Sequence, residues 1–332
     1  MRKRERSPMN ELGIRQQLEE IASLLREGDH YLIFSHERPD ADSVGSSLAL
    51  AYALRRLGKQ VKVFLSDAGF YQFAIGEEPI HGPEDLPTDP WPHPVIVLDC
   101  ESSRTGEFAA FTQNAPVIVN IDHHPSNVTK ATYRLVEPEA AACGELVFHL
   151  VKTLGVSLDQ RLATFLYIAL AGDTGGFRFS NTKARVFKVA ASLVEAGADP
   201  ADVATNLFMR KPLSYFRILS LALSRLRLDA SGKVASTAIT QEDLRVSGAS
   251  EEELEGIVDY TRMVIGVEVG ILFKEKTDGT VGVSLRSTGR VDVGSIASEF
   301  GGGGHVVASG CTVKGSLQEV CTKVIKRTCQ AL

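Results

Sequence analysis

Short apolar runs constrain the fold of this chain more than any other feature of its sequence. Four of them predict buried strands: YLIFSH at 31–36, VKVFLSD at 61–67, VIVLDC at 95–100 and VIVNID at 117–122. Helical patterns lie between and around them, such as SVGSSLALAYALRRLG, which is closed by Gly58. Apolar strands that alternate with helices, with few polar interruptions, predict an α/β fold: a mainly parallel sheet with helices on both faces.

The character of the sequence changes after this region. From Ala141 onward it is mostly helical, and beyond Asp229 apolar and polar residues alternate, with a DG turn at Asp278 and Gly279. This alternation predicts a smaller α/β domain with a mixed sheet. A chain of 332 residues also exceeds the usual size of a single domain. We therefore expect a disordered tail at 1–10, a first domain at 11–208, a helical connector at 209–229 and a second domain at 230–332.

The composition indicates the setting in which the protein works. Its net charge of -5 argues against a protein that coats long nucleic acid through a broad basic surface. The five cysteines are scattered without CxxC spacing, so neither a disulfide framework nor a zinc knuckle is indicated. No apolar run reaches the roughly 18 residues of a membrane span, and the N-terminal segment does not resemble a signal peptide. We expect a cytoplasmic protein with no membrane partner.

Acidic and imidazole side chains follow three of the strands and one apolar helix. They are His36, Asp40 and Asp42 after the first strand, Asp99 after VIVL, Asp122, His123 and His124 after VIVNI, and Asp173 in GDTGGF. The carboxyl ends of parallel strands share one edge of a sheet, where ligands bind. We therefore expect these side chains to converge.

Each of these residues also has an ordinary structural explanation. Asp42 can cap the helix that begins at Ser43. Asp99 can be a turn residue, and the two adjacent histidines can be one core residue and one exposed residue. Together, however, these explanations require four independent strand or helix ends to carry His or Asp by chance. The combined pattern favours a shared site.

The ligand types in this set point to divalent metal ions. Carboxylate and imidazole without thiolate suit Mn²⁺ or Mg²⁺ better than structural zinc. The four carboxylates of Asp40, Asp42, Asp99 and Asp173 balance the charge of two such ions. A metal pair about 3.5–4 Å apart can hold a hydroxide and clamp a phosphoryl group for in-line attack. The substrate phosphate then needs further cations, and His124 and basic residues of the second domain are candidates.

The segments HERPDADSVGS, VLDC, IDHH and GDTGGF resemble, in order, the four motifs of the DHH phosphoesterase superfamily. The metal ligands that this resemblance implies are His36 and Asp40 for one ion, Asp42, His123 and Asp173 for the other, and Asp99 as the bridge. It also implies that His124 contacts the scissile phosphate as an acid or electrostatic partner, and that Asp122 orients a histidine. Ala41 stands where glycine is common in the family.

A second motif region lies near the C-terminal end of the chain. The segment 284–310 contains an Arg-Ser pair and four consecutive glycines before a histidine. A glycine run can bind phosphate through backbone N–H groups, or it can be a flexible linker. The segment is similar to the DHH-associated C-terminal domain, although Ser309 replaces an alanine that is frequent there. The substrate contacts implied by this resemblance are Arg286, Ser287, Gly302, Gly303, Gly304 and His305.

The segment 260–275 resembles one branch of this superfamily, the bifunctional oligoribonucleases that dephosphorylate 3′-phosphoadenosine 5′-phosphate (pAp). In that branch Arg262 is a substrate contact; otherwise it is an ordinary solvated charge at a helix end. The resemblance implies an enzyme with two Mn²⁺, or Mg²⁺, that hydrolyses short oligoribonucleotides to mononucleotides and pAp to AMP. It is also compatible with a homodimer.

Other functions remain open at this stage. A cyclic di-AMP phosphodiesterase would use the same metal ligands. A nucleotide-binding regulator with an inactive metal site would show a damaged ligand set, whereas every expected ligand is present here. A RecJ-like exonuclease needs an extended basic channel that this acidic chain lacks, and a pyrophosphatase would need a Lys/Arg-rich clamp in its second domain.

Overall fold

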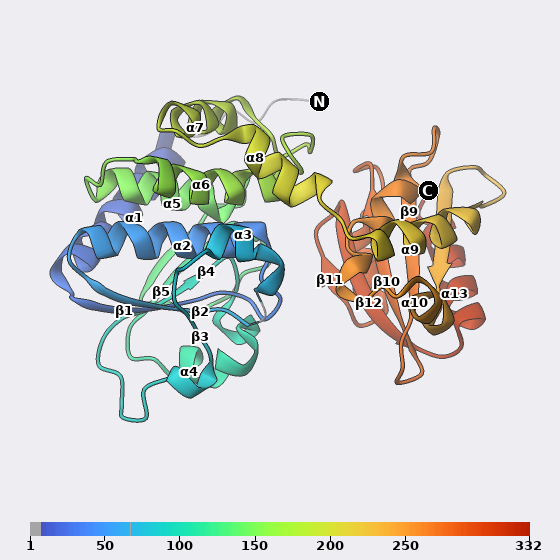
Figure 1. The fold of residues 1–332 in the computed structure, drawn as a ribbon, viewed down its shortest axis with the longest axis horizontal. Coiled ribbons are helices and arrows are strands. Elements are labelled where there is room, and N and C mark those ends of the chain that lie inside the picture. The colour runs from blue at the N-terminus through green and yellow to red at the C-terminus, as the bar shows by residue number, and fades with distance from the viewer. Residues whose placement is uncertain (1–7, 67) are drawn as a thin grey trace. The chain divides into compact units, whose positions relative to one another are not determined.

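The computed structural model describes residues 8–66 and 68–332, which form two compact units joined between Arg210 and Lys211. Figure 1 shows the two units, each with its own sheet. The tail predicted at 1–10 lies outside the described residues as far as residue 7. Pro8 already belongs to the first helix.

The first unit is built on a parallel sheet of six strands in the order β3-β2-β1-β4-β5-β6. The strands are β1 (His30–Phe34), β2 (Gln60–Phe64), β3 (Ile80–His81), β4 (Val95–Leu98), β5 (Ile118–Asp122) and β6 (Tyr133–Val136). Every residue of β4 and β5 is buried, because helices pack on one face and α4 with its flanking loops on the other (Figure 1). The predicted parallel α/β sheet is confirmed.

Most helices of this unit lie on one side of the sheet, and α4 lies on the other (Figure 1). The helices are α1 (Pro8–Glu27), α2 (Ala41–Arg56), α3 (Gln72–Ile75), α4 (Ala109–Gln113), α5 (Cys143–Thr153), α6 (Gln160–Asp173), α7 (Ala184–Glu195) and α8 (Pro200–Ala204). Glycines let α2, α5 and α6 approach closely. A Cβ atom on Gly144 would lie 2.4 Å from the Cβ of Ala169, and one on Gly172 would lie 2.5 Å from the Cβ of Ala41. This close packing brings the ends of three helices to one place.

The second unit contains a mixed sheet of six strands in the order β11-β12-β10-β9-β8-β7, as predicted. Only β8 and β9 pair in parallel among the described strands of this sheet. The strands are β7 (Arg227–Leu228), β8 (Val234–Ile239), β9 (Val269–Glu275), β10 (Thr280–Ser287), β11 (Gly303–Gly304) and β12 (Ala308–Lys314). The helices are α9 (Leu213–Ser224), α10 (Gln241–Ser247), α11 (Ile257–Arg262), α12 (Val293–Glu299) and α13 (Leu317–Cys329).

The helix α9 belongs to the core of this second unit. Ile218 and Ala222 are fully buried and cluster with Ile239 and Leu272 of the sheet. The stretch 209–229, which the sequence suggests as a connector, therefore contains a helix that covers one face of the second sheet.

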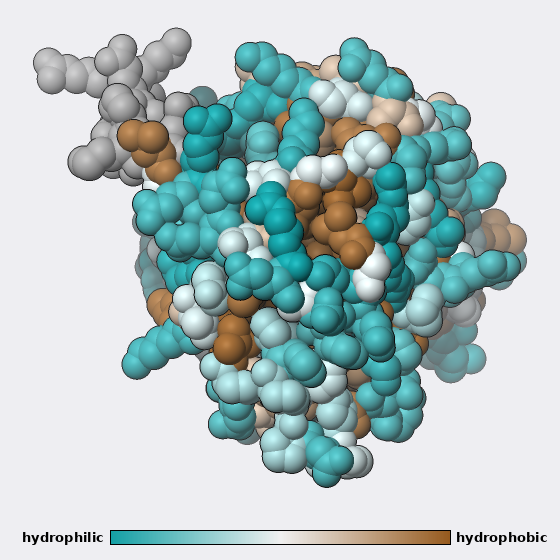
Figure 2. All heavy atoms as spheres, turned by 90° about the vertical axis from the view of Figure 1, so that its left-hand side faces the viewer, coloured by the Kyte–Doolittle hydropathy of each residue, from teal (hydrophilic) through white to brown (hydrophobic). Residues whose placement is uncertain are grey.

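Figure 2 shows one face of the molecule. Hydrophilic side chains predominate on this face, and hydrophobic ones gather in one central group and several smaller ones. Among the described residues, no helix combines the length and the apolar character that a membrane span needs.

Candidate metal centre

The predicted ligand residues come together where the strand order of the first sheet reverses. The neighbours β1 and β4 lie at this point, with β2 and β3 on one side and β5 and β6 on the other. His36 follows β1 and Asp99 follows β4. Such a reversal opens a crevice at the carboxyl ends of the strands, the usual ligand site of an α/β sheet.

Ligand atoms gather there in overlapping groups, each with all its atoms within 4.8 Å of one another. The groups are His36, Asp40 and Asp99; Asp42, His123 and Asp173; and Asp99, Asp122, His123 and His124. The first group contains the ligands that the motifs imply for one ion, including the bridging Asp99. The second group contains those implied for the other ion, without Asp99. The structure thus brings every predicted ligand of the first unit into one cluster.

The two histidines of these sets direct Nε2 toward carboxylates. His36 Nε2 lies 3.7 Å from Asp40 Oδ2 and 3.6 Å from Asp99 Oδ2. His123 Nε2 lies 3.1 Å from Asp173 Oδ2 and 3.8 Å from Asp42 Oδ2. The other ring nitrogen of His123 faces the carbonyl of Ala140 at 3.3 Å, an arrangement that leaves Nε2 as the ligand atom.

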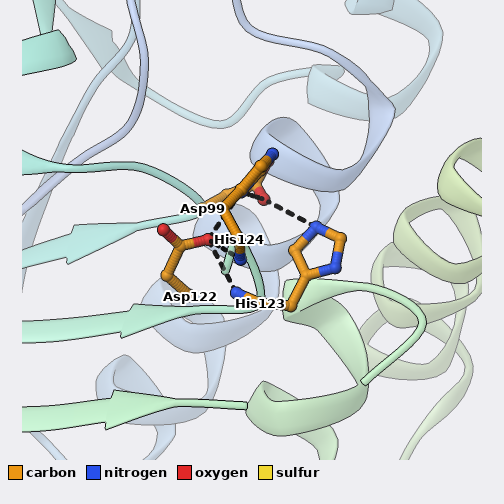
Figure 3. Close-up of side chains that lie close together, drawn as sticks. All are labelled: Asp99, Asp122, His123 and His124. Atoms are coloured by element: carbon orange, nitrogen blue, oxygen red, sulfur yellow. Dashed lines mark hydrogen bonds and ion pairs between the residues drawn. The ribbon is translucent and has the colours of Figure 1, made fainter. Parts of the chain in front are cut away.

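Asp99 lies between the two sets and is 2% exposed. Its Oδ2 faces His36, whereas its Oδ1 lies 3.4 Å from His123 Nε2 (Figure 3). The Oδ2 atom also accepts a hydrogen bond from Ser43 Oγ at 2.9 Å, but the buried Oδ1 accepts none from the described residues. A buried carboxylate oxygen without a hydrogen bond is costly, and a cation beside it reduces that cost. The residue also has φ 62°, an uncommon conformation outside glycine that often marks a functional position.

Two helix N-termini hold the aspartates of the first motif. Asp40, and not Asp42, is the N-cap of α2, because its Oδ1 accepts from the backbone N–H of Ser43 at 2.9 Å. Asp42 instead serves α5, whose own N-cap residue has no side-chain acceptor. Its carboxylate accepts from the backbone N–H groups of Cys143 at 2.6 Å and Gly144 at 2.9 Å. The interpretation of Asp42 as the N-cap of the helix that follows it is therefore wrong, because Asp40 caps α2.

Asp122 fixes the orientation of His124. Its Oδ1 lies 2.7 Å from His124 Nδ1 and also accepts from the backbone N–H groups of His123 and His124 (Figure 3). Its Oδ2 accepts from Asn127 Nδ2 at 2.5 Å. Asp122 is fully buried, whereas the side chain of His124 remains 22% exposed. His124 is thus held through Nδ1 at the edge of the cluster.

The electrostatics of the cluster reflect its crowded carboxylates. Burial and the neighbouring charge of Asp99 raise the pKa of Asp42 well above its usual value. Burial also raises the pKa of Asp173, to about 6. Burial opposes the ionisation of Asp99 too, but its contacts with His123 and His36 outweigh this and hold its pKa below the usual range. Desolvation alone would lower the pKa of His36, yet contacts with Asp40 and Asp99 raise it to about 10. The site favours bound positive charge.

The predicted arginines of the second unit lie on adjoining elements. Arg286 on β10 pairs with Gly270 of β9, and a Cβ atom on Gly270 would lie 3.3 Å from the Cβ of Arg262 at the end of α11. Arg286 Nε lies 3.4 Å from Asp259 Oδ1. The Nε atom of Arg262 is buried and has no hydrogen-bond partner among the described residues. Ser287 is also buried, and its Oγ accepts from the backbone N–H of Gly289.

The glycine run is part of the second sheet. Gly303 and Gly304 form β11, which pairs antiparallel with β12. A Cβ atom on Gly302 would lie 2.1 Å from the carbonyl oxygen of Gly310, so this position requires glycine. His305 is exposed and closes a tight turn with Ala308 through two backbone hydrogen bonds. The flexible-linker interpretation of this run is wrong.

Comparisons with known proteins agree with this geometry. The model described as "DHH family, N-terminal domain" matches residues 30–170, and "DHHA1 domain" matches residues 232–331. The protein of Thermus thermophilus named "Bifunctional oligoribonuclease and PAP phosphatase NrnA" is 36% identical over 301 residues, which are 89% of this chain and 88% of that protein. The chain belongs to the DHH family.

Two further comparisons concern one solved structure and one curated relative. An exopolyphosphatase-related protein from Bacteroides fragilis has a crystal structure that matches this DHH chain with a TM-score of 0.86, at 24% identity and 95% coverage of both chains. This confirms the fold. The cyclic-di-AMP phosphodiesterase GdpP of Geobacillus thermodenitrificans is 26% identical over 86% of this chain but only 45% of its own length.

Several polar residues that support Asp99 and the DHH triplet were not expected from the sequence. Ser43 donates to Asp99, and Asn127 donates to Asp122. Asn120, fully buried in β5, donates to the carbonyls of Val97 and Cys100 and accepts from Asn127. The sequence offered one signal of these supports, the amide side chain of Asn120 within an apolar strand. The partners of Ser43 and Asn127 depend on the fold and cannot be read from the sequence.

Proposed function

We propose that this protein is a two-metal phosphoesterase that hydrolyses short oligoribonucleotides to mononucleotides and pAp to AMP. The observation that carries the proposal is the position of Asp99, which offers one carboxylate oxygen to each of two ligand sets. The substrates rest on the name of the Thermus thermophilus relative.

The residues present fit a pair of divalent cations, and Mn²⁺ is our proposal, with Mg²⁺ as a substitute. The proposed ligands are His36 and Asp40 for one ion, Asp42, His123 and Asp173 for the other, and Asp99 for both. When bound, such a pair supplies a hydroxide nucleophile and neutralises phosphoryl charge. The oxygen of Asp99 that lacks a hydrogen bond supports this assignment.

His124 is the proposed acid or electrostatic partner of the scissile phosphate. Asp122 engages its Nδ1, and Nε2 is the ring atom that we assign to the substrate. In this role Nε2 holds a proton and delivers it to the leaving oxygen. Asp122 acts through this contact and keeps the ring in one orientation.

We also propose substrate contacts among the residues of the second unit. Arg262 and Arg286 supply guanidinium groups of a kind suited to phosphate. The proposed contacts also include Ser287, Gly302, Gly303, Gly304 and His305.

A cyclic di-AMP phosphodiesterase is the second candidate, because a DHH-family relative carries that name. Product analysis by chromatography separates the two. The protein is offered pAp, a linear diribonucleotide and cyclic di-AMP separately, each with Mn²⁺ and with a chelator. We expect mononucleotides from the linear dimer and AMP from pAp, only with Mn²⁺. Attack mainly on the cyclic compound would favour the second candidate.

A further inference from the structure

The loop that follows Asp173 has a rigid and unusual backbone. Gly175, Gly176 and Phe177 all have positive φ, at 56°, 68° and 65°. Phe177 is held in this conformation because its ring stacks on Phe187 at 5.7 Å and its N–H donates to Thr174 Oγ at 3.0 Å. Such strain in a non-glycine residue persists only where the surroundings enforce it.

Two aromatic rings cover the glycines of this loop and remain exposed. A Cβ atom on Gly175 would lie 2.3 Å from the ring of Phe179, and one on Gly176 would lie 3.3 Å from the ring of Phe208. The two phenylalanines are 43% and 36% exposed. Phe208 is presented by a π-helical turn, η5 (Thr205–Met209), a kind of turn that is frequent at functional sites.

Arg178 adds a cation to the same place. Its Nε donates to the carbonyl of Gly175 at 2.5 Å, and its guanidinium carbon lies 5.7 Å from the centre of the Phe208 ring. A guanidinium fixed by Nε keeps its Nη groups for an anion or for stacking.

These groups lie close to the metal ligands. Gly175 is two residues from Asp173, so their Cα atoms are at most about 8 Å apart. The carboxylate of Asp173 in turn lies 3.1 Å from His123. A nucleotide whose phosphate is bound at the ligand cluster can therefore reach these rings with its base.

We infer that Phe179, Phe208 and Arg178 form a nucleobase subsite beside the metal centre of the first unit. The inference rests on the proposed function and specifies how that function recognises its substrate. Exposed rings stack on any base, because every base has an aromatic face, and this suits an enzyme that degrades short RNA without regard to sequence. Arg178 contributes a positive charge that attracts the phosphate.

The test compares a diribonucleotide with the same compound lacking either base. Phe179→Leu and Phe208→Leu keep apolar volume but remove the ring face, and Leu57→Ala removes exposed apolar surface elsewhere in the first unit as a control. We expect each ring variant to raise the KM for the intact dinucleotide roughly 5- to 100-fold, the range that loss of base stacking produces. For at least one of the two abasic compounds, the KM of the variant should equal the KM of the wild type.

Binding without turnover separates this inference from the proposed function. Calorimetry with Ca²⁺ in place of Mn²⁺ measures the affinity for both kinds of dinucleotide. The subsite is supported if the wild type binds the intact compound more tightly than the abasic one and the ring variants do not. This holds even if the wild type hydrolyses neither compound. Equal affinity of wild type and variants for the intact compound would overturn the inference. A ring variant could instead show a lower mass in sedimentation than the wild type, together with an equal loss of affinity for the intact and abasic compounds. This result would overturn the subsite and assign the rings to a subunit interface.

Discussion

Asp99 is the residue on which the site depends most. It is buried, it faces both ligand sets, and its backbone adopts a conformation that asparagine tolerates better than alanine. Asp99→Asn therefore removes the charge with little change in shape, whereas Asp99→Ala adds backbone strain of about 1 kcal/mol.

We expect Asp99→Asn to lower kcat by at least roughly 100-fold, as loss of a group that stabilises transition-state charge does. The melting temperature should stay within a few degrees of the wild type. Steady-state kinetics on the linear dinucleotide and calorimetry check both points. A variant with normal turnover would remove Asp99 from the mechanism.

Asn127 is a positioning residue in this account. It donates to Asp122 Oδ2, and Asp122 in turn orients His124. Asn127→Leu should lower kcat about 10- to 100-fold, the usual effect of losing such a supporting contact, with KM and Mn²⁺ affinity unchanged. Asn127→Ser keeps a donor and should recover part of the activity. Equal losses in kcat and in Mn²⁺ affinity would indicate a general structural role instead.

The sequence predicted the candidate ligands but not the residues that support them. His36, Asp99 and Asp173 stand out because their types and positions at strand or helix ends are visible in one dimension. The partners of Ser43 and Asn127 join segments far apart in the chain, so only the fold shows them. The same reason explains why Asp42 looked like the cap of α2 but serves α5.

At the scale of elements, close helix packing brings the candidate ligands together. Gly144 in the first turn of α5 both donates to Asp42 and faces Ala169 of α6. In an ordinary exposed helix, Gly→Ala is stabilising by up to about 1 kcal/mol. Here the added methyl would collide with Ala169, and overpacking of this kind costs about 1–3 kcal/mol.

Gly144→Ala should therefore lower the free energy of unfolding, measured by denaturant titration. Ala169→Gly creates room for the methyl group, so the double variant should recover stability relative to the sum of the two single variants. Additive effects in this cycle would show that the two positions do not interact.

At the scale of the whole molecule, the two units have separate cores. The sequence placed the second domain at 230–332, because the strand pattern begins there. The apolar face of α9 predicted a helix, but periodicity does not tell which sheet a helix covers. The structure places α9 against β8 and β9.

This difference gives a test with two fragments. A fragment of residues 211–332 should unfold cooperatively on heating, because it retains both apolar clusters of the second unit. A fragment of residues 230–332 exposes the face that α9 covers and should melt at a lower temperature or fail to fold. Circular dichroism melts check this. Equal stability of the two fragments would show that α9 contributes nothing to this core.

Asp99 is proposed to bind two metal ions, one through each carboxylate oxygen. Anomalous diffraction from crystals grown with Mn²⁺ tests this proposal most directly. We predict two peaks, about 3.5–4 Å apart, one on each side of the Asp99 carboxylate. A single peak, or peaks away from this cluster, would contradict the two-metal mechanism.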